Sequence, residues 1–232
     1  MKVFRPQTPV VLISPHLDDV ALSCAKFVYS SPGAVVVTPL AGAPSGKHEG
    51  WSSRTTGESE SPAAQQVRRD EDARAMTLLA ARYVWLDLLA REYLHGDPSP
   101  TRGQDIKDAI QQTLKECDAV SVVAPLGITH SDHIAVSDAC IDIATESDLD
   151  WYLYLDMPYA QARPRRMWKR LGAIGERVDL QTFQPFEGDS DMKRQVVLSY
   201  ASQVLALKSG FGRKFDATIT GPEQYWSIRR AS

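Results

Sequence analysis

VVLISPHLDDVALSC, residues 10–24, places a polar turn between a short apolar run and a helical pattern. Residues 10–13 are apolar and mostly β-branched, which is typical of a buried parallel strand. Pro15 ends this strand, because proline has no backbone N–H to donate and restricts the residue before it. From Asp18 or Asp19 onward, the apolar residues follow helical spacing. One histidine and two aspartates therefore lie at the carboxyl end of a strand, the edge at which open α/β sheets bind their ligands.

The residue types of this turn point to metal chemistry. His16 and Asp19 are three residues apart, so in a turn that is already coiling they can converge on one point. A neutral imidazole and a carboxylate together bind divalent ions such as zinc. Asp18 points elsewhere and stays free to accept a proton. A lone aspartate here is best explained as a helix N-cap, but the pattern His-x-Asp-Asp at a strand end favours a site.

A second motif supplies the partner residues. GITHSDH, residues 127–133, follows another apolar run at 118–126, and the two motifs contain three of the five histidines in the chain. His133 would complete a His-Asp-His set with an open position for water, the pattern of catalytic rather than structural zinc sites. His130 would stand beside the metal as a hydrogen-bond donor, oriented by Asp132.

The order of the predicted elements brings the two motifs together. Strands and helices alternate, which predicts a doubly wound (Rossmann-like) α/β fold with a mostly parallel sheet, helices on both faces, and a single domain over residues 1–232. The motifs follow the first and fourth strands, which are neighbours in the doubly wound order, so they meet at the topological switch point. We expect strands at 10–14, 34–40, 83–86, 118–126, 151–155 and 178–186, helices at 65–82, 105–116, 133–146 and 191–209, and an anchored tail at 215–230.

The two motifs resemble those of a known enzyme family. PHLDD (15–19) and HSDH (130–133) resemble the Pro-His-x-Asp-Asp and His-x-Asp-His motifs of the PIG-L/LmbE-like zinc-dependent deacetylases, which remove N-acyl groups from glucosamine-type sugars. Weaker likenesses are RRDED (68–72), DMPY (156–159) and YASQ (200–203). Many members carry Glu directly after the two aspartates, where this chain has Val20. In that respect it looks more like the branch that acts on glycopeptide or natural-product amino sugars.

The resemblance implies roles for further residues. Arg68 would meet the sugar, although a solvated, salt-bridged helix surface would show the same charges. The long polar segment 41–66 leaves the same sheet edge and could fold over the substrate with Trp51 and Arg54; the alternative is a mobile loop with an incidental tryptophan. Tyr159, in the DMPY stretch, is a further substrate-binding candidate. The metal would be zinc, although Fe(II) or Co(II) also suit two histidines and one carboxylate.

Composition excludes several other functions. A net charge of −3 gives no reason to expect nucleic-acid binding. No apolar run approaches the roughly 20 residues needed to span a bilayer, so we expect no membrane partner. We expect no secretory signal in the N-terminal residues, and the three cysteines have no Cys-x-x-Cys spacing, so we expect reduced thiols in a cytoplasmic protein. The sequence is compatible with a monomer or a homo-oligomer.

Two other features stay outside the predicted site. His48 and His95 lie in polar segments, and we interpret His48 as a surface histidine. The segment 163–170 carries five positive charges, which is typical of a solvated loop; the alternative is an anion-binding rim of the pocket.

These observations predict a metal-dependent hydrolase that removes an N-acyl group, N-acetyl in the first instance, from an amino sugar or an amino-sugar-bearing natural product. The alternatives are a metal-dependent amidase acting on a non-sugar amide and a catalytically idle sugar-binding protein. Asp18 argues against the idle protein, because binding alone has no use for a free base beside the metal.

Overall fold

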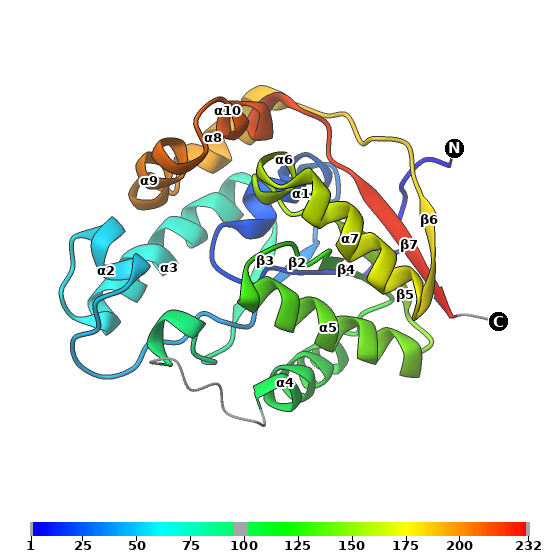
Figure 1. Cartoon of the computed structure of the whole chain (residues 1–232), viewed down its shortest axis with the longest axis horizontal. Helices are drawn as coiled ribbons and strands as arrows, with labels where there is room; N and C mark the ends of the chain where they lie inside the picture. Colours follow the sequence, from blue (N-terminus) through cyan, green and yellow to red (C-terminus); the bar gives the residue numbers. More distant parts are fainter. Residues whose placement is uncertain (1, 95–101, 231–232) are drawn as a thin grey trace.

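One mixed β-sheet organises the chain. The computed structural model describes residues 2–94 and 102–230, and seven strands within these ranges form the sheet (Figure 1). They are β1 (Val10–Ile13), β2 (Val35–Thr38), β3 (Arg82–Trp85), β4 (Ser121–Pro125), β5 (Asp150–Tyr154), β6 (Val178–Thr182) and β7 (Tyr225–Arg230). Their order is β3-β2-β1-β4-β5-β7-β6; the first five are parallel, and β7 runs antiparallel to both of its neighbours. The doubly wound, mostly parallel sheet is confirmed.

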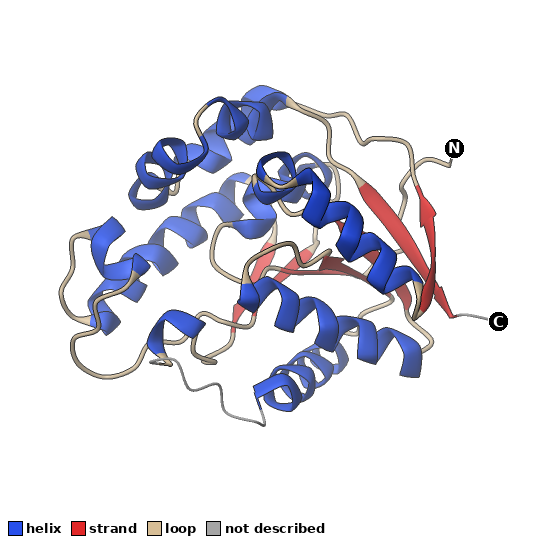
Figure 2. Cartoon of the chain, viewed as in Figure 1, coloured by secondary structure: helices blue, strands red, loops and turns tan. Residues whose placement is uncertain are grey.

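Helices cover both faces of the sheet (Figure 2). They are α1 (Asp19–Tyr29), α2 (Trp51–Thr56), α3 (Ser61–Leu78), α4 (Arg102–Glu116), α5 (Ser131–Glu146), α6 (Tyr159–Ala162), α7 (Pro164–Gly175), α8 (Ser190–Leu198), α9 (Ala201–Phe211) and α10 (Arg213–Thr220). Side chains of α4, α5 and α7 pack into one buried cluster, and side chains of α1, α3 and α8 pack into another. Within the described ranges, no helix is long and apolar enough to cross a membrane.

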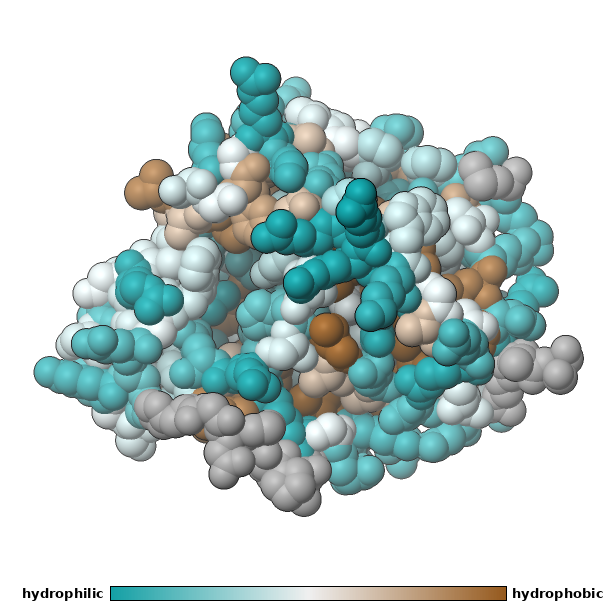
Figure 3. Space-filling model, viewed as in Figure 1, coloured by the Kyte–Doolittle hydropathy of each residue, from teal (hydrophilic) through white to brown (hydrophobic). Residues whose placement is uncertain are grey.

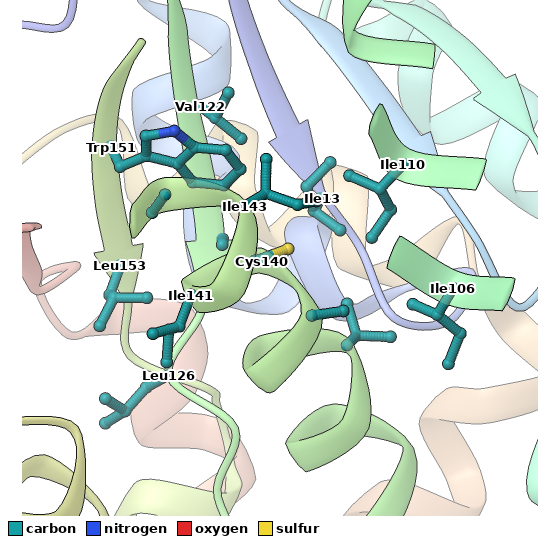
Figure 4. Close-up of a cluster of buried hydrophobic side chains, with 14 of the residues drawn as sticks. Ile13, Ile106, Ile110, Val122, Leu126, Cys140, Ile141, Ile143, Trp151 and Leu153 are labelled. Atoms are coloured by element: carbon teal, nitrogen blue, oxygen red, sulfur yellow. The ribbon is translucent and has the colours of Figure 1, made fainter. Parts of the chain in front are cut away.

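The alternation of side chains along each strand divides the core into two layers. In β1, Val11 and Ile13 belong to the cluster under α4 and α5, whereas Val10 and Leu12 belong to the opposite one. Figure 4 shows the first cluster, with Ile13 beside side chains from β4, β5, α4 and α5. All four residues of β1 are buried, and each such side chain contributes roughly 1.5–3 kcal/mol. A strand buried on both faces fixes the position of the turn that follows it.

β1 and β4 are neighbours, as the predicted strand order requires. Val11 pairs with Val122 in parallel register, so both strands end at the same edge of the sheet. The two motifs follow these ends directly, which places them side by side at the predicted crevice.

The C-terminal third differs from the sequence-based expectation. The helix expected at 191–209 is two helices, α8 and α9, that meet at Tyr200, whose hydroxyl donates to the buried Asp72 on α3 (2.6 Å). The tail 215–230 contains α10 and then β7, which inserts between β5 and β6. These features depend on contacts between distant segments, which local periodicity does not encode.

Two segments expected to be irregular contain helices. The basic run 163–170 lies mostly in α7, whose first residue is Pro164, a favourable position because proline has no N–H to leave unpaired there. The segment 41–66 contains α2 and the start of α3. His95 lies outside the described residues. His48 is half-buried, with Nδ1 3.1 Å from the hydroxyl of Ser61.

Candidate active site

Two strand-to-helix turns form the site. In the turn after β1, Asp18 has a backbone φ of 130°, which residues other than glycine rarely adopt. In the turn after β4, Gly127 (φ 81°) and Thr129 (φ 60°) make the sharp bend, and His130 has ordinary extended geometry. Together the turns bring five polar side chains to one place: His16, Asp18, Asp19, His130 and His133.

Asp19 lies between two histidines. Its Oδ2 is 3.4 Å from His16 Nδ1 and 3.2 Å from His133 Nε2. The three side chains are 5%, 14% and 1% exposed respectively, so little water reaches them. Two imidazole nitrogens and a carboxylate that face one point are the donor set that a catalytic zinc ion uses.

Each of these imidazoles is hydrogen-bonded to a second carboxylate through the ring nitrogen that faces away from Asp19. His16 Nε2 donates to Asp132 Oδ2 (2.9 Å), and His133 Nδ1 donates to Asp156 Oδ1 (2.7 Å). Because a carboxylate accepts, these bonds place the ring proton on the outer nitrogen and leave a lone pair on the nitrogen that faces Asp19. Among the described residues, buried His133 Nε2 has no hydrogen-bond partner. A divalent ion would satisfy this atom, so the residues fit a metal.

The electrostatics of the three residues agree with this fit. Burial lowers the pKa of His133, but the negative charges of Asp19 and Asp156 and the hydrogen bond to Asp156 outweigh it and raise that pKa to about 10. Burial also lowers the pKa of His16, but the hydrogen bond to Asp132 and the negative charges of Asp19 and Asp132 outweigh it, so that the pKa is raised. Against its own burial, Asp19 has a lowered pKa because His133 and His16 favour its ionised form. Without a metal the pocket therefore holds protons, and a cation would replace them.

His130 occupies a different role in the second turn. It precedes α5, and its Nδ1 accepts a hydrogen bond from the backbone N–H of Asp132 at 3.3 Å. Burial, and then the positive charges of His16 and His133, lower the pKa of His130 to about 4, so its ring is neutral near pH 7. A neutral ring whose Nδ1 accepts carries its proton on Nε2, which makes Nε2 a donor.

Two sets of residues could hold a metal, and the tautomer of His130 bears on the choice between them. Nitrogens of His16, His130 and His133 lie within 4.8 Å of one another, so His130 is an alternative ligand by distance. A ligand nitrogen needs a free lone pair, and in a neutral His130 the lone pair of Nδ1 is already engaged by the backbone N–H. This contact favours Asp19 over His130 as the third residue that could hold a metal.

Asp18 precedes α1 without capping it through its side chain. No cap hydrogen bond from its side chain is found within the described ranges; instead the hydroxyl of Ser14 accepts the N–H of Val20 at 3.1 Å. Burial, and then the neighbouring carboxylate of Asp19, raise the pKa of Asp18 to about 7. The Arg68 guanidinium lies 3.9 Å away. A strained residue with a carboxyl group poised near neutrality is typical of a reactive position.

A cavity of about 460 Å³ opens above these residues. Arg68, Trp51 and Tyr159 line it, as the sequence predicts for substrate contacts, whereas the exposed Arg54 on α2 is not among its described lining residues. Arg68 is held in place by bonds to the hydroxyl of Ser52 (3.1 Å) and the carbonyl of Leu17 (3.2 Å). The remaining wall is largely apolar and includes Leu22, Pro158, Leu207 and Phe211.

The structure differs from the sequence-based site in two further respects. The carboxylate of Asp132 contacts His16 rather than the ring of His130, and it also accepts from the backbone N–H of Arg91 (3.0 Å) and the guanidinium of Arg102. Asp156 had not been assigned to the site. Its position directly after a buried strand was the available signal, because residues there reach the same edge of the sheet.

Trp51 connects the cavity wall to the C-terminal helices. Its indole N–H donates to Gln203 Oε1 on α9 at 2.6 Å, and α9 also contributes Leu207 and Phe211 to the wall. The segment 41–66 therefore borders the site, as expected, through a contact between α2 and α9.

Comparison with known proteins agrees with this architecture. The PIG-L family, described as GlcNAc-PI de-N-acetylase, matches residues 11–144, more than half of the chain. No curated protein matches the chain in sequence. Solved structures are also similar in fold, among them three deacetylases. A deacetylase triple mutant from the teicoplanin biosynthetic pathway is 24% identical, with 97% of this chain and 99% of that chain covered and a TM-score of 0.80. The A40926 pseudoaglycone deacetylase is 24% identical, with 96% of this chain and 98% of that chain covered and a TM-score of 0.72. The N,N'-diacetylchitobiose deacetylase from Pyrococcus horikoshii is 16% identical, with 98% of this chain and 88% of that chain covered and a TM-score of 0.55.

Proposed function

The chain belongs to the PIG-L (GlcNAc-PI de-N-acetylase) family, and on this premise we propose that it is a metal-dependent hydrolase that removes the N-acetyl group of an amino sugar or an amino-sugar-bearing natural product, with residues 1–232 acting as one domain. The observation that carries the proposal is the convergence of His16 Nδ1, His133 Nε2 and Asp19 on one point, beside a carboxyl group, Asp18, that takes no part in it.

His16, Asp19 and His133 would hold the metal, with zinc favoured and Fe(II) or Co(II) as alternatives. When bound there, a divalent ion polarises the amide carbonyl and makes an attacking water more acidic. Asp132 and Asp156 fix the tautomer and orientation of the two imidazoles through the bonds at 2.9 and 2.7 Å. The outer carboxylates thus keep both lone pairs directed at the metal.

Asp18 would be the general base. It lines the cavity, and its pKa of about 7 allows it to accept a proton from the attacking water and to return that proton to the leaving amine near neutral pH. The Arg68 guanidinium at 3.9 Å stabilises the ionised form of Asp18 while leaving its carboxylate accessible.

His130 would stabilise the oxyanion. Its neutral ring presents Nε2–H as a donor on the same side of the cavity as His16, whose ring centroid is 5.1 Å away. A donor held in place before the reaction stabilises the negative charge that develops on the carbonyl oxygen in the transition state.

The substrate class follows from the cavity and from the similar structures. Trp51 and Tyr159 offer flat apolar faces and Arg68 a charged donor, which suits a sugar ring. The similar structures are deacetylases of a teicoplanin pathway, of the A40926 pseudoaglycone and of N,N'-diacetylchitobiose, all of which support an N-acetylated amino sugar here. Val20 after the two aspartates supports the natural-product branch.

Acetate release over a substrate panel tests this function. The panel contains methyl N-acetylglucosaminide, N,N'-diacetylchitobiose, an N-acetylglucosaminyl glycopeptide and, as a non-sugar amide, an N-acetyl amino acid. We expect acetate from at least one sugar and none from the amino acid, and release by Asp18→Asn that is slower on the order of 10²–10⁴-fold. Release from the amino acid alone would identify a non-sugar amidase. Sugar binding without any release would identify an idle binding protein.

A further inference from the structure

A second cavity of about 390 Å³ adjoins the candidate active site. Its lining includes Thr129, Tyr159, Arg163, Arg166, Phe211 and Lys214, and we call it the basic groove. Tyr159 and Phe211 also line the first cavity, so the two spaces share an aromatic wall. Thr129, directly before His130, brings the groove to within one residue of the proposed oxyanion donor.

The charge of the basic groove is uncompensated. Arg163, Arg166 and Lys214 are exposed, and none of them forms an ion pair with an acid in the part of the chain that the structure describes. Farther along α7, Arg170 does have an acidic partner, Asp138, at 2.6 Å. The chain as a whole carries a net charge of −3, so three unpaired cations in one groove run against its overall charge.

Figure 3 shows strongly hydrophilic side chains gathered over α6 and the first part of α7, close to the paler and browner surface of α9. This juxtaposition of charge and apolar surface matches the lining of the groove, in which Arg163 lies between α6 and α7, the other basic side chains come from α7 and α10, and the aromatic wall comes from α6 and α9.

The aromatic wall sets the direction of a bound substrate. The ring of Tyr159 lies 5.0 Å from that of His133 and 5.7 Å from that of Phe211, at 88° to the latter. An acylated sugar whose amide lies at His133 would therefore contact Tyr159, and the substituent that continues past Phe211 would enter the basic groove. Guanidinium groups bind carboxylate and phosphate oxygens with charge-assisted, paired hydrogen bonds.

Building on the proposed function, we propose that the substrate carries an anionic group, a carboxylate or a phosphate, on the part beyond its acylated sugar, and that Arg163, Arg166 and Lys214 bind this group. The basic groove is then a specificity site for an anionic amino-sugar conjugate. Its residues touch the substrate away from the reacting amide and take no part in the chemical step.

Three matched substrates test the proposal. They are glycosides of N-acetylglucosamine with the same short alkyl chain, ending in a methyl group, a carboxylate or a phosphate. We expect kcat/KM for at least one anionic glycoside to exceed that for the neutral one by about 10-fold, as for a charge-assisted contact. Because these cations are exposed, 0.5 M NaCl should reduce the preference.

Two double variants, each of which removes two positive charges, distinguish a direct contact in the basic groove from the overall electrostatic potential of the protein. Arg163→Ala with Arg166→Ala should bring the preference to within about twofold, and Lys214→Ala should lower it in part. Arg165→Ala with Lys169→Ala removes two exposed cations of α7 that are not among the described lining residues of the groove, and should keep the preference. All these positions are exposed, so we expect folding to be retained.

Each outcome decides the matter. No preference in the wild type, or an equal loss in both double variants, would overturn the basic groove as a specificity site. If no glycoside releases acetate, the deacetylase proposal fails, and calorimetric titration with the de-acetylated glycosides tests the groove separately. Tighter binding of an anionic glycoside that is weakened only by Arg163→Ala with Arg166→Ala would uphold the groove; equal binding of all three would reject it.

Discussion

The two turns that form the site differ in which residue carries the backbone strain and in which side chain caps the helix that follows. In the turn after β1 the proposed base itself is strained: Asp18 has φ 130°, and the hydroxyl of Ser14 caps α1 in its place. In the turn after β4 the strain lies on Thr129, at φ 60°. The proposed oxyanion donor that follows, His130, has relaxed geometry and accepts the N–H of Asp132 with its Nδ1.

We therefore expect the proposed functional residue of the first turn to affect activity without stabilising the fold, and that of the second turn to affect both. Asp18 contributes an accessible carboxylate at a cost in backbone strain and in buried charge, so its removal is expected to harm activity without harming the fold. His130 contributes both a helix cap and a donor, so its removal is expected to harm both. The comparison can be tested at each turn.

The largest effect is expected where both turns meet, at the metal. If His16 and His133 both bind it, the wild type should contain about one divalent ion per chain. Either His16→Ala or His133→Ala should lose that ion and all measurable activity, because each removes one of three ligands. Elemental analysis of protein purified without chelator measures the occupancy. The control His48→Ala, outside the site, should keep the ion; full occupancy in both site variants would refute the ligand assignment.

Asp18→Asn isolates the functional part of the first turn. It keeps the size of the side chain and removes the base, so kcat should fall on the order of 10²–10⁴-fold with the metal retained. Steady-state kinetics and elemental analysis on the same preparation test this. A rate near that of the wild type would show that Asp18 is not the base.

The pH profile of the wild type gives a second measure of Asp18. The base must be ionised, so kcat/KM should be full above the pKa of Asp18 in the free enzyme and decline as pH falls through it. That pKa is raised from 3.8 to about 7 by burial and by Asp19. A divalent ion bound nearby favours the ionised form, so the acid limb should have its midpoint between these values. An acid limb centred above 7 would contradict this assignment.

We expect replacement of His130 to lower both the activity and the stability of the protein. His130→Ala should lower kcat by about 10²–10³-fold, as for the loss of an oxyanion donor, and leave KM and the metal unchanged. It should also lower the free energy of unfolding by about 1 kcal/mol through loss of the cap. Kinetics and urea unfolding measure the two effects.

A matched variant separates the two roles of His130. Asparagine is among the best N-cap residues, so His130→Asn should restore most of the lost stability while kcat stays low. If His130→Ala lost the metal, His130 would be a ligand and the tautomer argument would be wrong.

The sequence predicted those parts of the site that depend on local pattern and strand order. Buried runs ending in Pro15 and Pro125 placed two turns at one sheet edge, and the residue types in these turns indicated His16, Asp19 and His133. A strand that is buried on both faces leaves little freedom for the turn that follows, which is why the local pattern sufficed here.

Contacts between distant segments could not be predicted in the same way. Asp132 turns toward His16 rather than toward His130, two residues away, because Arg91 and Arg102 from another segment fix its carboxylate. The contact between Trp51 and Gln203 likewise joins residues far apart in the chain. Such partners follow from packing, which one sequence does not reveal.

The smallest expected effect is a change of stability with opposite signs in the two turns. Asp18→Gly should relieve a backbone strain of about 1–3 kcal/mol, while glycine's freedom in the unfolded chain costs about 0.4–1 kcal/mol. Both Asp18→Gly and Asp18→Asn remove the charge, so the comparison between them isolates the backbone. Asp18→Gly should then be more stable than Asp18→Asn by about 1 kcal/mol.

His130→Gly should change stability in the other direction, because φ is −72° at this position and there is no strain to relieve. The variant loses the cap and gains freedom in the unfolded chain, so its free energy of unfolding should fall by about 1 kcal/mol. Thr129→Gly, one residue earlier at φ 60°, should instead gain stability, because a β-branched residue is strained there. Urea unfolding of chelator-treated protein measures all four variants without a contribution from bound metal. If Asp18→Gly were no more stable than Asp18→Asn, the first turn would hold no strain, and the contrast between the two turns would reduce to the capping bond of His130.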